Sequence, residues 1–226
     1  MKYQFSLFPN LSRVFGLGLL SLLGLVGFLT IDSSWGAEDD KERWNKKYET
    51  ETYLFGREPI PFLKNHVDLL PKGAALDLAM GEGRNGVFLA TKGFHVTGVD
   101  ISEAGLKKAQ ALATEKGVTL TTVVADLDQY SIPPETFDVI ICTYYLQRDL
   151  FKKIATALKP GGMVLIETYT VDHLKYRPKF NRAFLLERNE LLTLLPGLRV
   201  LHYQEVDTGD AAFASLLAQK SSQTIR

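Results

Sequence analysis

The feature that most constrains the fold is the regular alternation of short apolar runs with amphipathic segments between residues 74 and 219. The apolar runs predict strands, at residues 74–79, 94–100, 119–126, 137–143, 163–169, 198–204 and 211–219. The segments between them predict helices, at residues 83–93, 102–117, 148–160 and 187–197. Strands that alternate with helices indicate a parallel sheet covered on both faces. The predicted fold class is therefore α/β, a doubly wound, seven-stranded and mostly parallel sheet.

The composition is that of an ordinary globular domain and excludes several classes of protein. The 226 residues include 26 Lys and Arg against 26 Asp and Glu, so the formal net charge is zero. A neutral chain lacks the electrostatic footprint of nucleic-acid binding, and we expect no nucleic-acid partner. The single Cys142 lies in the apolar run 137–143, where we expect a buried thiol. One cysteine offers neither an internal disulfide nor a ligand cluster, so no metal site is predicted.

A hydrophobic segment precedes the predicted domain. Residues 14–31 carry no charge, and their number is at the lower limit for a membrane-spanning helix. The segment is either an uncleaved anchor or the core of a cleaved signal, because small residues suited to cleavage follow it. Basic residues flank both of its ends, so the charge distribution gives no clear orientation. We divide the chain into residues 1–37, an anchor or signal with one hydrophobic helix, and residues 38–226, the folded domain.

The loop after the first predicted strand has the spacing G-x-G-x-x-G, at Gly81, Gly83 and Gly86. This spacing is typical of a turn that lies against a nucleotide cofactor, because glycine lets the backbone approach a ligand closely. In a doubly wound sheet such ligands bind at the carboxyl ends of the strands. The residues at those ends are therefore the informative ones.

Three acids stand near the ends of the first three predicted strands: Asp77, Asp100 and Asp126. A pyrophosphate needs backbone N–H groups and no nearby negative charge, and Asp77 would repel it by about 1 kcal/mol in water. S-adenosylmethionine instead presents an ammonium and a sulfonium, which the same carboxylate attracts. Asp100 suits the ribose hydroxyls of either cofactor, and Asp126 suits an adenine amino group. The position of Asp77 therefore favours S-adenosylmethionine over a dinucleotide.

The stretches LDLAMGEGRNG, VTGVDIS, VVADL, FDVIIC and LKPGGMVLIETYT resemble, in order, the motifs of class I S-adenosylmethionine-dependent methyltransferases. They cover most of residues 74–170. The resemblance implies a Rossmann-like methyltransferase fold and S-adenosylmethionine as the cofactor. Ala79 departs from the pattern, since it stands where the family's loop usually has its first glycine. Residues 43–63 resemble the tellurite-resistance-type branch, in which a helix and loop close over the cofactor, and we define residues 38–70 as the lid region.

The resemblance implies a set of cofactor contacts, carried over by position. They are Asp77, Gly81, Gly83, Asp100, Asp126 and Leu127 in the sheet region, and Arg43, Trp44, Asn45 and Tyr48 in the lid region. An amphipathic surface helix is the alternative for the lid residues. Arg84 and Asn85 are explained as well by capping or exposure as by cofactor contact.

Acceptor-side residues are expected after the fourth and fifth predicted strands. Tyr145 and Arg148 follow the fourth strand, and Arg148 would orient an oxyanion or a carboxylate. The alternative is that Tyr144 and Tyr145 are core and interface aromatics. The polar stretch 169–190 is typical of a lid or acceptor loop, with His173 and Arg177 as candidates and a plain solvated loop as the alternative. Residues 142–145 lack the Asn/Asp-Pro-Pro-aromatic tetrad of the family's amide and amino-base methylases, which argues against nucleobase or glutamine methylation.

These observations predict an enzyme that transfers a methyl group from S-adenosylmethionine to a small-molecule acceptor. An oxyanion or a thiol needs little beyond alignment, whereas a hydroxyl needs a general base. The alternatives are an NAD(P)-dependent oxidoreductase and a non-catalytic, membrane-tethered S-adenosylmethionine sensor. We expect membrane association through residues 14–31 with the domain in the cytosol, because S-adenosylmethionine is made inside cells. Export after signal cleavage is the alternative location.

Overall fold

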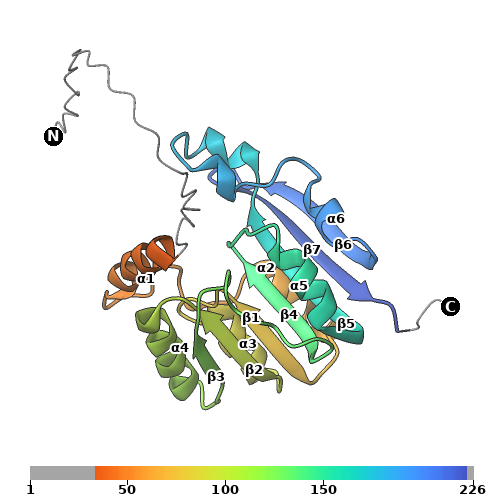
Figure 1. Ribbon diagram of the computed structural model, residues 1–226, viewed down its shortest axis with the longest axis horizontal. Helices are drawn as coiled ribbons and strands as arrows, with labels where there is room; N and C mark the ends of the chain where they lie inside the picture. The colour runs from red at the N-terminus through yellow and green to blue at the C-terminus, as the bar shows by residue number, and fades with distance from the viewer. Residues whose placement is uncertain (1–33, 223–226) are drawn as a thin grey trace, which may run out of the picture. The chain divides into compact units, whose positions relative to one another are not determined.

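The computed structural model describes residues 34–222. Its centre is a seven-stranded sheet in the order β3-β2-β1-β4-β5-β7-β6 (Figure 1). The strands are β1 (Ala74–Leu78), β2 (His95–Asp100), β3 (Thr121–Val124), β4 (Phe137–Thr143), β5 (Leu158–Tyr169), β6 (Leu198–Asp207) and β7 (Ala212–Lys220). The first five strands run parallel, and β7 is antiparallel to both of its neighbours. The predicted α/β fold with a seven-stranded, mostly parallel sheet is confirmed.

Helices cover both faces of this sheet. They are α1 (Ser34–Tyr48), α2 (Pro61–His66), α3 (Arg84–Thr91), α4 (Glu103–Glu115), α5 (Leu150–Ala157) and α6 (Leu191–Leu194), with the 3-10 helices η1 (Val67–Leu69), η2 (Val171–Lys175) and η3 (Arg182–Phe184). Ile140 and Ile141 are adjacent in β4 but belong to different cores, because successive side chains of a strand point to opposite faces. The core of Ile140 includes residues of α5 and α6, and the core of Ile141 includes residues of α2, α3 and α4.

Two helices are clearly shorter than the sequence predicts. The helix expected over 148–160 ends at Ala157, and β5 begins at once with Leu158. Pro160 disfavours a helical conformation at the residue before it, and Gly161 has a φ of 80°. The helix expected over 187–197 is confined to Leu191–Leu194, because Asn189 has a φ of 62°, which no right-handed helix contains.

The hydrophobic segment 14–31 and its predicted helix lie outside the described residues. Between residues 34 and 222, no helix has both the length and the apolar character needed to cross a membrane. The predicted anchor or signal therefore stays a prediction.

The strand order places the ligand site of this fold. From the centre of the sheet, β1 leads outward through β2 and β3, and β4 leads outward through β5 in the opposite direction. Ligands of doubly wound sheets bind at this switch point, outside the carboxyl ends of the strands. In this chain the switch point lies between β1 and β4, which end at Leu78 and Thr143.

Candidate cofactor and acceptor site

A cavity of about 610 Å³ opens at the carboxyl ends of β1 to β4, within the usual size range of small-molecule sites. The loops after these four strands and the lid region form its walls. The lining residues include Arg43, Trp44, Tyr48, Gly81, Gly83, Arg84, Asp100, Asp126, Leu127, Tyr144 and Tyr145. The structure therefore brings together most of the predicted cofactor contacts.

The glycine loop is shaped by close packing as well as by its own turns. Gly81 and Gly83 have φ values of 55° and 86°, in the left-handed region that favours glycine. A Cβ atom on Gly81 would lie 2.7 Å from the Tyr48 hydroxyl, and one on Gly83 would lie 2.5 Å from the Cβ of Ala109. Ala79 adopts a φ of 55° without this freedom, at a cost of about 1 kcal/mol. The turn is thus formed despite the alanine.

Asp100 ties the glycine loop to the end of β2. Its Oδ2 accepts a hydrogen bond from the Gly81 N–H (2.7 Å), and its Oδ1 accepts one from the Ser102 N–H (2.8 Å). Burial raises the pKa of the carboxyl, and these backbone donors oppose the rise. The side chain lines the cavity and is only 7% exposed. Asp100 therefore both orders the loop and presents negative charge to a ligand.

Asp77 does not line the cavity, although the sequence places it beside the glycine loop. It shares a strand face with Ala75, on the side covered by α3, because side chains alternate along β1. A Cβ on Gly86 of α3 would lie 2.8 Å from its Oδ2. Among residues 34–222, no donor bonds that oxygen. Burial raises the pKa of this carboxyl to about 8, and the Gly86 N–H only partly opposes the rise. A direct cofactor contact from Asp77 is therefore not what the geometry favours.

The lid region contributes aromatic rings and one anchoring amide. Trp44 and Tyr48 stack with ring centroids 5.5 Å apart, and both line the cavity. Asn45 does not line the cavity, and its Oδ1 accepts hydrogen bonds from the Ser102 hydroxyl (2.7 Å) and the Ala104 N–H (3.2 Å). Ser102 also caps α4 by accepting from the Gly105 N–H. Asn45 thus fastens α1 to the start of α4.

Of the two acceptor-side residues predicted after β4, the structure places only one at the cavity. Tyr145 lines the cavity, whereas Arg148 does not, because its guanidinium donates to both carboxylate oxygens of Glu190 at 2.6 and 2.9 Å. Arg148 also donates to the backbone oxygens of Ala183 and Leu185. Its expected role in orienting an acceptor is therefore corrected: Arg148 holds the stretch after β5 in place.

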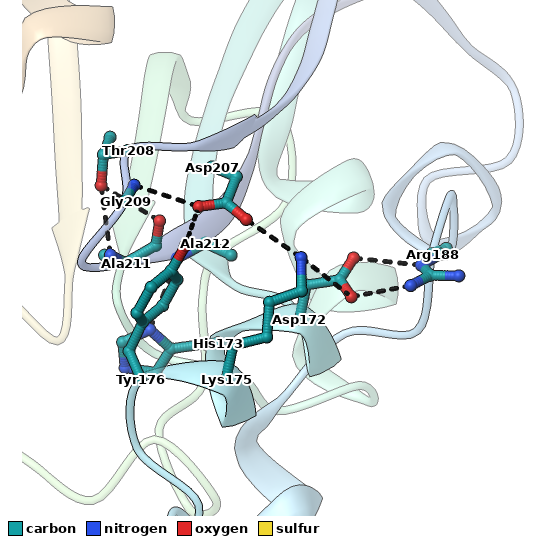
Figure 2. A network of polar contacts seen from close by, with 10 residues as sticks. All are labelled: Asp172, His173, Lys175, Tyr176, Arg188, Asp207, Thr208, Gly209, Ala211 and Ala212. Atoms are coloured by element: carbon teal, nitrogen blue, oxygen red, sulfur yellow. Dashed lines mark hydrogen bonds and ion pairs between the residues drawn. The ribbon is translucent and has the colours of Figure 1, made fainter.

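His173 and Arg177 also lie outside the cavity lining. Figure 2 shows η2 fastened to the turn between β6 and β7, where Lys175 and Tyr176 both bond the carboxylate of Asp207. His173 stacks on Tyr169 at 4.1 Å, and its Nδ1 accepts a hydrogen bond from the Ala212 N–H (3.4 Å). This packing lowers the pKa of His173 through burial and the nearby charge of Arg177. His173 in η2 and Tyr176 directly after it thus hold this stretch against the ends of β6 and β7.

The sequence left Arg84 and Tyr144 undecided, and the structure puts both at the cavity. The Arg84 guanidinium lies 5.4 Å from the centre of the Tyr144 ring and donates to the Phe55 backbone oxygen at 2.7 Å. The neighbouring Asn85 donates to the Thr143 hydroxyl (2.9 Å). In the sequence, only their positions pointed to these two residues. Arg84 is the first residue of the helix after the glycine loop, and Tyr144 directly follows β4.

The charge of the cavity wall distinguishes the candidate cofactors. Six acidic residues line it against two arginines. A cationic ligand is attracted by this wall, and a pyrophosphate is repelled. The glycine cradle, which a Cβ would fill, and the Asp100 carboxylate fit S-adenosylmethionine. Within residues 34–222, no three His, Cys, Asp or Glu side chains are grouped so as to hold a metal ion.

Comparison with known proteins agrees with this geometry. Residues 75–162 match the family model described as a methyltransferase domain. A ubiquinone biosynthesis O-methyltransferase from Idiomarina loihiensis is 34% identical over 115 residues, which are 48% of this chain and 47% of that protein. Phosphoethanolamine N-methyltransferase 2 from Caenorhabditis elegans is 30% identical over 142 residues, 58% of this chain and 32% of that protein. The chain thus spans about half or less of these relatives' length.

Among solved structures, a geranyl diphosphate C-methyltransferase from Streptomyces coelicolor has a similar fold. The TM-score is 0.63, the sequence identity is 16%, and the match covers 81% of this chain and 98% of that one. That enzyme was solved with Mg²⁺, geranyl diphosphate and S-adenosyl-L-homocysteine. At this identity the likeness concerns the fold.

The fold, the cavity and the matched segment define a nucleotide-cofactor domain of the methyltransferase class. Residues 75–162 form the methyltransferase domain, and the matches together support a class I S-adenosylmethionine-dependent methyltransferase, as the sequence motifs predicted. Its cofactor is accordingly S-adenosylmethionine. The tellurite-resistance branch stays a prediction.

Proposed function

We propose that this protein transfers a methyl group from S-adenosylmethionine to a small-molecule acceptor. The observation that carries the proposal is the acid-lined cavity that the glycine loop and Asp100 build at the switch point. S-adenosylmethionine supplies an electrophilic methyl group when bound. The residues that would hold it are Gly81, Gly83, Asp100, Asp126 and Leu127. In the lid region, Trp44 and Tyr48 would exclude water from the bound cofactor. Alignment of the reacting groups and exclusion of water account for much of the rate of such a displacement.

The acceptor would enter beside Arg84, Tyr144 and Tyr145. None of the ion pairs found within residues 34–222 involves Arg84, so its charge is available to an anionic group of the acceptor. The named proteins methylate oxygen, nitrogen and carbon, so their names do not identify the atom that this chain methylates. That atom has to be inferred from the cavity. An oxyanion or a thiol remains a candidate, and nothing in the comparisons supports an oxidoreductase or a sensor.

The proposal is tested by isothermal titration of the protein with S-adenosylhomocysteine and, separately, with NADH. We expect micromolar binding of S-adenosylhomocysteine and no saturable binding of NADH, because the cavity wall carries excess negative charge. Binding of NADH alone would contradict the proposal and favour the dehydrogenase reading of the glycine spacing.

We further propose that residues 14–31 hold the domain at a membrane, with the domain in the cytosol. The support is the uncharged sequence of the segment and the intracellular origin of the cofactor. Protease added to intact cells should leave the domain whole, and protease added after lysis should cut it. Cleavage in intact cells would place the domain outside.

A further inference from the structure

Arg84, Tyr144 and Tyr145 form one wall of the cavity, which we call the acceptor wall. A buried carboxylate lies directly behind this wall, bonded to Tyr144. Glu167 is the tenth residue of β5 and only 2% exposed. Its Oε1 accepts a hydrogen bond from the Tyr144 hydroxyl (2.8 Å), and its Oε2 accepts one from the Ser215 hydroxyl (2.7 Å). No Lys or Arg within residues 34–222 forms an ion pair with it. A carboxylate buried with two hydroxyl donors is costly to keep, which suggests a use beyond packing.

Sheet register brings the three groups together. Glu167 pairs with Thr143 at the end of β4 and with Ser215 in β7, so it lies between the two partner strands. Tyr144, the residue after β4, has a φ of 56°, and its N–H donates to the backbone oxygen of Glu167 at 2.6 Å. A tyrosine in the left-handed region costs about 1–3 kcal/mol, and such strain gathers at functional sites. Here the strained residue is the one that joins the cavity to the carboxylate.

The direction of the hydrogen bonds determines what this arrangement can do. The Tyr144 O–H donates to Glu167, so the lone pairs of the phenol oxygen are left to accept from a neighbour. Tyr144 lines the cavity, whereas Glu167 does not. A hydroxyl in the cavity would therefore reach Glu167 only through Tyr144.

We propose that Tyr144 and Glu167 accept the proton of a hydroxyl acceptor, so that the cavity takes a small molecule with an acidic, phenol-like hydroxyl. This inference rests on the proposed methyl transfer. As the acceptor oxygen bonds the methyl carbon, the carbon–sulfur bond breaks and its electron pair stays on the now neutral sulfur. The acceptor proton passes to the Tyr144 oxygen, and the Tyr144 proton passes to the Glu167 carboxylate. Glu167 later loses this proton to water, which restores the starting state.

The surroundings of the pair suit this role. Burial raises the pKa of Glu167, while the hydrogen bonds from Ser215 and Tyr144 and the charge of Arg84 oppose the rise. A proton acceptor with a pKa moved toward the working pH is more effective than an ordinary carboxylate. Arg84, against the Tyr144 ring, stabilises the negative charge that forms on the acceptor oxygen. A thiol acceptor, whose pKa of about 8.5 lies below the value of about 10 for a phenol, would have less need of the pair.

The test uses 4-nitrophenol, whose phenolate absorbs visible light and whose neutral form does not. The probe is titrated into the full chain with S-adenosylhomocysteine, about one pH unit below the probe's own pKa, where the free probe is mostly neutral. We expect saturable binding with a phenolate band. Tyr144→Phe and Glu167→Gln should each reduce the bound phenolate at least tenfold and leave the affinity for S-adenosylhomocysteine unchanged.

Tyr203→Phe is the control, because Tyr203 donates to Glu205 (2.6 Å) in an exposed tyrosine–glutamate pair outside the cavity lining. It should keep the phenolate band. The proposal is overturned if the band survives in either cavity variant that keeps its fold, or if the wild-type chain binds no 4-nitrophenol. The titration with S-adenosylhomocysteine reports separately on the proposed function. Tyr144→Phe keeps the carboxylate in place, so it decides the matter even where Glu167→Gln fails to fold.

Discussion

Asp100→Ala should weaken binding of S-adenosylhomocysteine about 100-fold or more. The substitution removes the two hydrogen bonds that the carboxylate accepts from the Gly81 and Ser102 N–H groups. Each hydrogen bond to a charged group contributes about 1.5–3 kcal/mol, and both buried N–H groups are left without a partner. Every 1.4 kcal/mol is about a factor of ten in affinity. Isothermal titration against the wild-type chain measures the loss.

Two further variants separate the cofactor site from general stability. Asp100→Asn keeps one acceptor oxygen and turns an amide donor toward the other N–H, so we expect a smaller loss, about 10-fold to 100-fold. Asp68→Asn changes an exposed aspartate outside the cavity lining and should bind as the wild type does. Thermal unfolding of each variant shows whether the fold is retained. A folded Asp100→Ala protein with unchanged affinity would remove Asp100 from the cofactor site.

Asp77 should make the folded state less stable as the pH rises from about 4 to about 8. Burial raises the pKa of this carboxyl from 3.8 to about 8, so between these values the folded state binds a proton that the unfolded state has released. The stabilisation is fully present below pH 3.8 and is lost as the pH rises through the folded-state pKa. Asp77→Asn cannot ionise and should lack this loss. The melting temperature of the variant should therefore rise relative to wild type toward pH 8, with a gap of several kcal/mol in free energy of unfolding.

Asp138 provides a control of opposite sign. Its carboxylate bonds Lys159 (2.8 Å) and the Ala74 N–H (2.8 Å), and these partners lower its pKa despite some desolvation. Asp138→Asn should therefore be less stable than wild type at neutral pH, and the difference should shrink as the pH falls through the lowered pKa. Equal pH profiles for the wild-type chain and Asp77→Asn would show that Asp77 is ionised in the folded protein at neutral pH.

Local sequence determined the features that depend on neighbouring residues. The alternation of apolar runs and helical segments predicted all seven strands, because strand and helix periodicities are local properties. The cap of α4 by Ser102 is also local, since the bond from the Gly105 N–H to the Ser102 hydroxyl spans three residues. Asp100, Gly81 and Gly83 lie at the cavity because the carboxyl ends of parallel strands share one edge.

Only the tertiary structure decided which side chains reach the cavity. Asp77 is covered because the pleat of β1 turns it toward α3, and one residue along the strand reverses that direction. Arg148 is withdrawn by Glu190, 42 residues later in the chain, which leaves Arg84 as the guanidinium in the acceptor wall. Tyr144 and Ser215 lie 23 and 48 residues from Glu167. Such pairs form through sheet register and burial, which depend on contacts between distant segments and therefore leave no periodic signal in the sequence.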